Sequence, residues 1–181
     1  MRKIILNLAV SLDGFIEGPN GEYDWCLTDQ DYGMDAFFEN CDTIFIGRKS
    51  YELISTDTSI FPVEQIYVFS DTLPEEQGMN VSVVKSYEFD DTVERVMNEP
   101  GKNIWLFGGA ELLSAFLNKN LIGEMILSIH PILLGAGKNL FKNLNDRVEL
   151  IFISQQTYSS GLLQAKYALK PKFDMDMLAK L

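Results

Sequence analysis

Short apolar runs that stop at glycine, aspartate or a polar cluster recur along the chain, and they predict the strands of a sheet. Runs of this kind, without strict alternation of apolar and polar residues, are typical of strands that are buried on both faces of a parallel sheet. Two later runs flank Ser159-Ser160-Gly161, which indicates a hairpin. Strands are therefore expected at residues 3–12, 43–46, 65–70, 81–84, 103–107, 124–130, 148–158 and 162–169.

Segments with apolar residues at helical spacing lie between these strands, and the first of them has Thr28 or Asp29 as its expected N-cap. Strands that alternate with helices, followed by two successive strands, predict an α/β fold with a mostly parallel central sheet and an antiparallel hairpin at its C-terminal edge. One domain is expected over residues 1–170, with a Gly-rich loop at 131–142 and a C-terminal tail at 171–181. Helices are expected at residues 28–40, 48–54, 90–98 and 110–118.

Composition and charge narrow the classes of protein to which the chain can belong. Of its 181 residues 46% are hydrophobic, which fits a globular domain, and 26 acidic against 15 basic residues give a formal net charge of −11. Nucleic acid is not an expected partner, because proteins that bind it neutralise its phosphates with an excess of Lys and Arg, whereas this chain has an excess of acidic residues. A membrane is not expected either, because no apolar run approaches the roughly 20 residues of a membrane-spanning helix.

Cysteine and histidine are scarce, and this argues against a metal site. The chain has two cysteines, Cys26 and Cys41, without a CxxC pair, and His130 is its single histidine. A site built from His and Cys needs more ligands than these. The cysteines are expected to be inert free thiols in a reduced, cytoplasmic setting, and His130, at a strand end before Pro131, is interpreted as structural.

Two apolar strands end at glycine and turn directly into a helix, at residues 47–50 (Gly-Arg-Lys-Ser) and 108–110 (Gly-Gly-Ala). A helix N-terminus offers unpaired N–H groups and a partial positive charge, and glycine allows a phosphate to approach the backbone. Such turns are suited to bind anions, and Arg48 and Lys49 add formal charge. The alternative is that Gly47 only ends a strand and that Arg48 and Lys49 are solvated. Neither turn matches the GxGxxG or GxxxxGK(S/T) pattern of phosphate-binding loops.

Four stretches in order carry a resemblance to a known family. They are residues 9–16 (Ala-Val-Ser-Leu-Asp-Gly-Phe-Ile), 46–52 (Ile-Gly-Arg-Lys-Ser-Tyr-Glu), 105–112 (Trp-Leu-Phe-Gly-Gly-Ala-Glu-Leu) and 131–141, with the pattern Pro-x-x-x-Gly-x-Gly-x-x-x-Phe. The chain resembles the dihydrofolate reductase-like family, and most closely its branch that contains the riboflavin-biosynthesis reductase, the RibD C-terminal domain. The resemblance implies the three-layer dihydrofolate reductase-like fold and an NADPH-dependent oxidoreductase. Such an enzyme transfers hydride to a pteridine or an aminopyrimidine, such as 5-amino-6-(5-phosphoribosylamino)uracil, and a homodimer is implied as well.

By the same resemblance, one set of residues would bind the cofactor. The two glycine turns would line its phosphates, Ile16 would border the nicotinamide, and Ser70 and Asp71 would lie near the adenine ribose. A 2′-phosphate there prefers a cation, whereas Asp71 is an anion, so NADH stays open beside NADPH. The expected cofactor-binding residues are Ala9, Ile16, Gly47, Arg48, Lys49, Ser50, Ser70, Asp71, Phe107, Gly108, Gly109, Ala110, Glu111 and Leu112.

Reduction of a C=N bond needs a proton for nitrogen as well as hydride for carbon. The family places a carboxylate a few residues after a tryptophan, in the helix that faces the pterin. Counting from Trp25 reaches Gln30, so the neighbouring Asp31 is the expected catalytic acid, and a buried carboxylate there could deliver or relay a proton. The alternative is that the acidic residues of this helix only cap its N-terminus. The resemblance also implies substrate-binding residues, namely Trp25, Asp35, Ile54 and Ser128.

Two other functions stay open. A genuine dihydrofolate reductase would use Asp31 as its acid. A nucleotide-binding protein without turnover could share the fold, because fold does not determine function.

Overall fold

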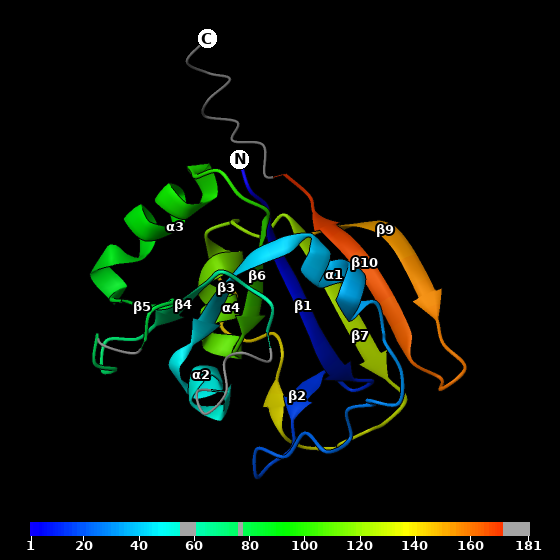
Figure 1. Cartoon of the computed structure of the whole chain (residues 1–181). Helices are drawn as coiled ribbons and strands as arrows, with labels where there is room; N and C mark the ends of the chain where they lie inside the picture. The colour runs from blue at the N-terminus through cyan, green and yellow to red at the C-terminus, as the bar shows by residue number, and fades with distance from the viewer. Residues whose placement is uncertain (55–60, 76–77, 172–181) are drawn as a thin grey trace.

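The computed structural model describes residues 1–54, 61–75 and 78–171, so the expected tail lies outside the described residues from position 172 onward. Within these residues, an eight-stranded sheet crosses the molecule and helices cover both of its faces (Figure 1). The strands of this sheet are β1 (Ile4–Ser11), β3 (Cys41–Gly47), β4 (Gln65–Phe69), β5 (Val81–Val84), β6 (Asn103–Gly108), β7 (Glu124–His130), β9 (Leu150–Thr157) and β10 (Leu163–Leu169). The helices are α1 (Met34–Glu39), α2 (Arg48–Ile54), α3 (Phe89–Asn98) and α4 (Ala110–Asn118), with a 3-10 turn, Ser86–Glu88, before α3.

The order of the strands confirms the expected sheet. It is β5-β4-β3-β6-β1-β7-β10-β9 across the molecule. The strands from β5 to β7 pair in parallel, whereas β10 pairs antiparallel with β7 and with β9. Both the mostly parallel centre and the antiparallel C-terminal hairpin agree with the sequence prediction. Because parallel strands end at the same edge of a sheet, the turns after β1, β3, β6 and β7 are brought close together.

Alternate residues of the central strands point to two separate cores. Leu106 of β6 and Met125 of β7 pack with α3 and α4, whereas Trp105 and Ile126 pack with α1 and α2 on the other face. Strands that are buried on both faces in this way have continuous apolar sequences. The face with α1 and α2 also contains a cavity.

Two segments differ from the sequence prediction. The helix expected at residues 28–40 is shorter, since α1 starts at Met34, directly after Gly33 in a left-handed conformation (φ 85°). Left-handed backbone cannot continue a right-handed helix, so the preceding residues lead to α1 without belonging to it. The second difference is a two-stranded ribbon of β2 (Phe15–Glu17) and β8 (Lys138–Asn139): β8 lies within the expected loop at 131–142, and no strand was expected at residues 15–17.

The amino ends of β1, β3 and β6 are tied together by a buried ion pair. Arg2 donates through Nη2 to a carboxylate oxygen of Asp42 and, over 2.7 Å, to Oγ1 of Thr43. Its Nε donates to the carbonyl oxygen of Lys102 at 2.5 Å, and the backbone N–H of Lys102 donates to Asp42 at 2.7 Å. Both charged side chains are buried and have their partners within the chain, so this network needs no ligand.

Candidate active site

The two glycine turns, at residues 47–50 and 108–110, lie side by side in the structure. β3 pairs with β6, with Ile46 opposite Gly108. A Cβ atom added to Gly47 would lie 3.5 Å from both the carbonyl oxygen of Gly108 and the nitrogen of Gly109. The peptide bond between Gly108 and Gly109 is cis. Two turns that are far apart in the sequence therefore form one surface at the carboxyl edge of the sheet.

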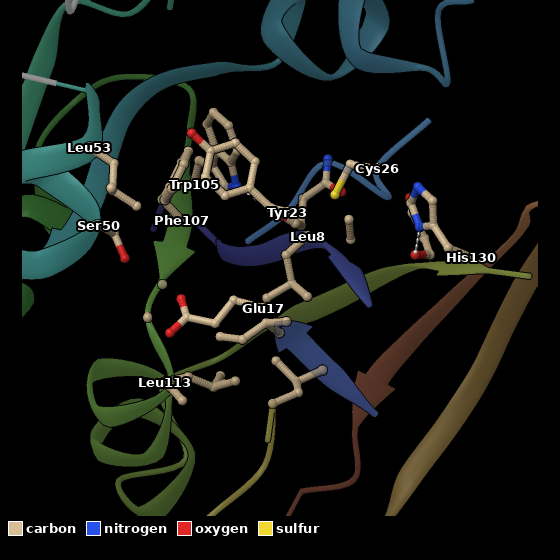
Figure 2. A pocket seen from close by; sticks show the side chains of 18 of the residues that line it. Leu8, Glu17, Tyr23, Cys26, Ser50, Leu53, Trp105, Phe107, Leu113 and His130 are labelled. Carbon is tan, nitrogen blue, oxygen red and sulfur yellow. Dashed lines mark hydrogen bonds between the residues drawn. The ribbon is translucent and has the colours of Figure 1, made fainter. Parts of the chain in front are cut away.

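Ser50 and Lys138 add polar groups to this surface. A Cβ atom on Gly109 would lie 3.3 Å from Oγ of Ser50 and 3.7 Å from Nζ of Lys138. Nζ of Lys138 is also 3.2 Å from Oε1 of Glu17, across the β2–β8 ribbon. Figure 2 shows Ser50 and Glu17 pointing toward the turn that connects β6 to α4. The sequence prediction missed Lys138 and Glu17, because their position depends on the pairing of β2 with β8.

Gly137 allows the β2–β8 ribbon to close. Its φ is +147°, and a Cβ atom there would lie 2.1 Å from the carbonyl oxygen of Glu17. A side chain at this position would push β8 away from β2. The one sequence signal that could have indicated the ribbon is the Gly-x-Gly spacing of residues 135–137, directly before Lys138.

Asp13 joins the first sequence motif to the Gly-rich loop. Its carboxylate accepts hydrogen bonds from Oγ of Ser11 at 2.6 Å and from the backbone N–H groups of Gly135 at 2.7 Å and Leu134 at 3.2 Å. These hydrogen bonds, above all that from Ser11, lower the pKa of Asp13 below its ordinary value of 3.8. The carboxylate is therefore charged at neutral pH, and the first and fourth motifs form one structural unit.

A cavity of about 410 Å³ opens beside the glycine turns, between the sheet and the segment that precedes α1. Its volume suits a small ligand, since ligand cavities usually measure roughly 300–1,000 Å³. Figure 2 shows Ser50 and His130 at opposite ends of this cavity, with Leu8 and Tyr23 between them. The residues that line it are Asn7, Leu8, Ala9, Ile16, Glu17, Tyr23, Cys26, Leu27, Tyr32, Met34, Ser50, Leu53, Ile54, Trp105, Phe107, Gly108, Gly109, Ala110, Leu113, Ser128, His130, Leu140 and Leu162.

The wall of the cavity is mostly apolar, and three of its polar side chains stand on neighbouring strands. Asn7 of β1 and Ser128 and His130 of β7 share one face of the sheet, because alternate residues of a strand share a face and Ala9 lies opposite Ser128. The hydroxyl oxygen of Ser128 accepts a hydrogen bond from Nε2 of Gln164 at 3.2 Å. An apolar wall with a few polar groups at fixed positions can bind a flat ring and set its orientation.

Comparison with known proteins identifies the family. The model of the RibD C-terminal domain matches residues 2–164 of the 181. The chain belongs to the RibD C-terminal domain family. It is 41% identical to the uncharacterized protein YyaP of Bacillus subtilis (strain 168) over 179 residues, which cover 92% of this chain and 94% of YyaP.

Solved structures agree with this family. A crystallised protein of Shewanella sp. PV-4 that is named for riboflavin biosynthesis is 27% identical, with a TM-score of 0.77 over 94% of this chain and 100% of that protein. A dihydrofolate reductase of Enterococcus faecalis, complexed with NADP(H) and RAB-propyl, is 13% identical, with a TM-score of 0.65 over 93% of this chain and 97% of that one. The second likeness concerns the fold alone. The chain therefore has the dihydrofolate reductase-like fold that its motifs predicted.

The structure brings many of the expected site residues of this RibD-like domain to the cavity. Two expected residues of α4 do not line the cavity. The side chain of Leu112 packs in the hydrophobic core, and Glu111 forms an ion pair with Lys142. Five further residues stand at the carboxyl ends of β3 and β4 and do not line the cavity: Gly47, Arg48, Lys49, Ser70 and Asp71. Those that line the cavity are Ala9, Ile16, Ser50, Ile54, Phe107, Gly108, Gly109, Ala110 and Ser128.

Two of the charged groups at the ends of β3 and β4, Arg48 and Asp71, have partners within the chain. Arg48 forms an ion pair with Glu52 at 2.7 Å. The carboxylate of Asp71 accepts the backbone N–H of Ser86 at 2.7 Å, and this hydrogen bond lowers the pKa of Asp71. Asp71 is therefore an anion at neutral pH, as the sequence analysis assumed.

The expected catalytic acid does not lie in the cavity. Asp31 is exposed, and its Oδ1 accepts the backbone N–H groups of Met34 at 2.7 Å and Asp35 at 3.4 Å, so its carboxylate caps the start of α1. Asp35 is exposed as well and does not line the cavity. The physical reason for Asp31 is the late start of α1 after Gly33, which leaves this residue outside the helix. The helix-capping alternative describes Asp31 in this structure.

Trp25 lies behind the cavity wall instead of in it. Its indole packs edge-on against His130, with ring centroids 5.2 Å apart and an interplanar angle of 85°. Its Nε1 donates to the carbonyl oxygen of Glu22 at 3.3 Å. Trp25 therefore contacts His130, a lining residue, and is not itself among the residues that line the cavity.

Asp31 does not line the cavity, but other ionisable side chains do. Among the described residues, Glu17 is the one carboxylate and Cys26 the one thiol that do so. Burial, together with the charge of Asp24, raises the pKa of Cys26 to about 11, so this thiol is protonated at neutral pH. In the part of the chain that the structure describes, no group of three His, Cys, Asp or Glu side chains could hold a metal ion, and no helix could span a membrane.

Proposed function

We propose that the chain is a cytoplasmic, NADPH-dependent reductase that transfers hydride to a small planar heterocycle, a pteridine or an aminopyrimidine such as 5-amino-6-(5-phosphoribosylamino)uracil. The observation that carries this proposal is that the two glycine turns meet at one end of a mostly apolar cavity. Membership of the RibD C-terminal domain family and the likeness to the Shewanella protein support this class of substrate. The free thiols of Cys26 and Cys41 support a reducing setting.

The residues at the glycine turns fit the diphosphate of a dinucleotide. The space that a Cβ atom of Gly109 would fill lies beside Oγ of Ser50 and Nζ of Lys138, so a hydroxyl donor and a cation converge where the backbone is open. The helix α4, nine residues long, starts at Ala110 with unpaired N–H groups that favour an anion. Lys138 would exchange Glu17 for a phosphate oxygen.

The chain's own side chains would hold and orient the reacting rings. Ile16 and Phe107 offer apolar surface in the cavity and exclude water from it. When bound, NADPH supplies the hydride. The amide of Asn7 and the hydroxyl of Ser128 can form hydrogen bonds with the edge of the heterocycle, and this would determine which of its atoms faces the cofactor.

NADPH is proposed in preference to NADH because of Arg48 and Lys49. Both cations stand at the start of α2, beside the end of β4, where Ser70 and Asp71 follow. A 2′-phosphate could pair with Arg48, whose geometry suits phosphate, whereas Asp71 would repel it. The preference for NADPH is therefore expected to be moderate. The Enterococcus faecalis dihydrofolate reductase, which shares the fold, is complexed with NADP(H).

A binding titration followed by a turnover assay tests this function. Trp105 lines the cavity, so its fluorescence should be quenched when NADPH binds. Oxidation of NADPH is then measured with the aminopyrimidine and, separately, with dihydrofolate. The expected result is turnover of the aminopyrimidine. Turnover of dihydrofolate alone would favour a dihydrofolate reductase, binding without turnover would favour a nucleotide-binding protein, and a lack of cofactor binding would contradict the proposal.

The edge strand β9 supports a second part of the proposal, a homodimer. Four consecutive apolar residues of β9, Leu150 to Ile153, are 41–56% exposed, and β9 has β10 on one side only. An exposed apolar edge strand is a ready surface for pairing with another chain. A second copy of this chain would cover that surface through its own β9, since most oligomers of identical chains are symmetric dimers.

Sedimentation equilibrium of wild type and of the double variant Ile151→Lys, Ile153→Lys tests the dimer. Two lysines at this edge should convert the dimer to a monomer, whereas Thr157→Lys near the end of the same strand should leave it dimeric. A monomeric wild type would contradict this part of the proposal without affecting the proposed reaction.

A further inference from the structure

Positive charge is found at the glycine turns and is missing from the wall of the cavity. Arg48 and Lys49 belong to the first turn, and Nζ of Lys138 would lie 3.7 Å from a Cβ atom on Gly109 of the second. None of the described residues that line the cavity is Lys or Arg. The cations that suit a phosphate are therefore confined to the turns where the diphosphate is proposed.

The stretch of chain that supplies much of the cavity wall is acidic. Between Lys3 and Arg48 the sequence contains no Lys or Arg. The lining residues from Asn7 to Met34 all belong to this stretch. Its acidic residues stand at positions 13, 17, 22, 24, 29, 31, 35, 39 and 42. A negative field is therefore expected over this part of the wall.

Two of these acids act on side chains of the wall. Oδ1 of Asp29 accepts a hydrogen bond from the hydroxyl of Tyr32 at 2.6 Å. The charge of Asp24 adds to burial in raising the pKa of Cys26 to about 11. Both Tyr32 and Cys26 line the cavity. The negative charges of Asp24 and Asp29 therefore act on the cavity, although both residues are exposed to solvent.

The side chains on which these carboxylates act lie toward the end of the cavity away from the glycine turns. Figure 2 shows Cys26 on the side of His130. Tyr32 is joined to β7, the strand that ends at His130, because Nε2 of Gln164 donates both to the carbonyl oxygen of Tyr32 at 3.1 Å and to Oγ of Ser128 at 3.2 Å. With the diphosphate at the glycine turns, this end would hold the heterocycle.

Two other groups that could bind an anion here are already engaged. The start of α1 borders the cavity through Met34, but its N–H groups donate to Asp31, at 2.7 Å in the case of Met34. Nδ1 of His130 lies 2.9 Å from the carbonyl oxygen of Ser128, and its Nε2 is buried. Among the described residues, an anionic group at this end would find neither a free cation nor an uncapped helix.

We infer that the site selects an uncharged heterocycle over one that carries a phosphate or a carboxylate. This inference rests on the proposed function and adds to it the charge of the substrate. An anionic group in the cavity would lose water and meet the field of Asp24 and Asp29 without a cation to offset either cost. The dephosphorylated form of 5-amino-6-(5-phosphoribosylamino)uracil should therefore have a higher kcat/KM than the phosphorylated form.

Two probes of nearly the same shape test this charge selectivity. Pterin-6-carboxamide is neutral, whereas pterin-6-carboxylate carries a negative charge at neutral pH. Fluorescence titrations of the free protein and of its NADP⁺ complex give the Kd of each probe. The carboxamide is expected to bind at least about tenfold more tightly. In about 1 M NaCl, where the Debye length falls to about 3 Å, the gap between the two probes should narrow, whereas a gap caused by shape would stay.

Variants test which charges are responsible. The double variant Asp24→Asn, Asp29→Asn removes two charges and keeps an acceptor for the hydroxyl of Tyr32, and it should narrow the gap between the probes about threefold. The matched control is Asp91→Asn, Glu94→Gln. It removes two charges from exposed positions of α3, on the opposite face of the sheet, and should leave the gap as in wild type.

The outcomes separate this inference from the proposed function. Equal affinity for the two probes, tighter binding of the carboxylate, binding of neither probe, a gap that salt does not change, or equal gaps in the two double variants would each overturn the charge selectivity. A protein that discriminates between the probes as expected but neither binds nor oxidises NADPH would contradict the proposed function and leave this inference standing.

Discussion

Buried polar groups at the two ends of the parallel strands differ in whether they have hydrogen-bond partners. At the amino ends, Arg2 and Asp42 form a buried ion pair, and Thr43 and Lys102 supply further hydrogen bonds. At the carboxyl ends, Nε2 of His130 is buried without a hydrogen-bond partner among the described residues, although other atoms of this residue line a cavity. Burial of a polar group is therefore not in itself the mark of a site. A buried group whose partners all come from the chain is satisfied within the fold, whereas a buried group without a partner lowers the stability of the folded state.

The largest expected effect concerns the amino end. Asp42→Ala leaves the charge of Arg2 buried without its partner, and this should lower the free energy of unfolding by about 3–5 kcal/mol. Urea unfolding measures the change, while the activity per folded molecule should stay as in wild type. Glu99→Ala, which breaks the exposed ion pair with Arg95, is the matched control and should cost less than about 1 kcal/mol. Equal losses in the two variants would contradict the assignment of Arg2 and Asp42 to a buried network whose members depend on one another.

Alkylation of the two cysteines allows the two ends of the parallel strands to be compared by one chemical reaction. Burial and the charge of Asp42 raise the pKa of Cys41, at the amino end, to about 12, whereas burial and Asp24 raise that of Cys26, in the cavity, to about 11. Alkylation needs the thiolate, and a higher pKa lowers its fraction at neutral pH. Cys26 should therefore react roughly a hundredfold more slowly than a thiol with the ordinary pKa of 9.0, and its rate should rise with pH up to about 11.

Mass spectrometry after iodoacetamide treatment at increasing pH measures both rates. Cys26 should be modified first, and the pteridine lumazine, added together with NADP⁺, should protect it, because Cys26 lines the cavity. Earlier modification of Cys41, or equal rates with and without ligand, would contradict the assignment of the two thiols to a closed network and an open cavity.

A methyl group at the glycine turns should block the cofactor. Gly109→Ala places a Cβ atom 3.3 Å from Oγ of Ser50 and fills the proposed diphosphate site, so the Kd for NADPH should rise at least about tenfold. Fluorescence titration measures the Kd. Gly123→Ala, whose Cβ atom would make ordinary contacts of 3.5 Å or more outside the cavity, is the control. Unchanged affinity in Gly109→Ala would place the diphosphate elsewhere.

The smallest expected effect concerns the cation at the glycine turns. Lys138→Met keeps the aliphatic stem and removes the charge, and it should raise the Kd for NADPH about fivefold, because one charge-assisted hydrogen bond is lost and Glu17 loses its partner. Lys170→Met removes a lysine that is paired with Glu149 far from the cavity and should leave the Kd unchanged. If both variants bind NADPH as wild type does, Lys138 only stabilises the β2–β8 ribbon.

The sequence by itself determined the sheet and the two glycine turns of the candidate site. The apolar runs at residues 43–46 and 103–107 became β3 and β6, because a strand that is buried on both faces must be apolar throughout. The glycine turns that follow them could be read locally as well, since a turn from strand to helix and its open backbone are properties of neighbouring residues. The pairing of parallel strands then brought the two turns together.

Only the tertiary structure decided the other half of the site. Asp31 was expected in the cavity and instead caps α1, because one left-handed residue, Gly33, delays the helix. Lys138 reaches the glycine turns only through the pairing of β2 with β8. His130 was interpreted as structural, and the structure places it against Trp25, with its Nδ1 beside the carbonyl of Ser128, in the wall of the cavity. Whether a buried side chain has a partner depends on the whole fold, and no local pattern in the sequence reports it.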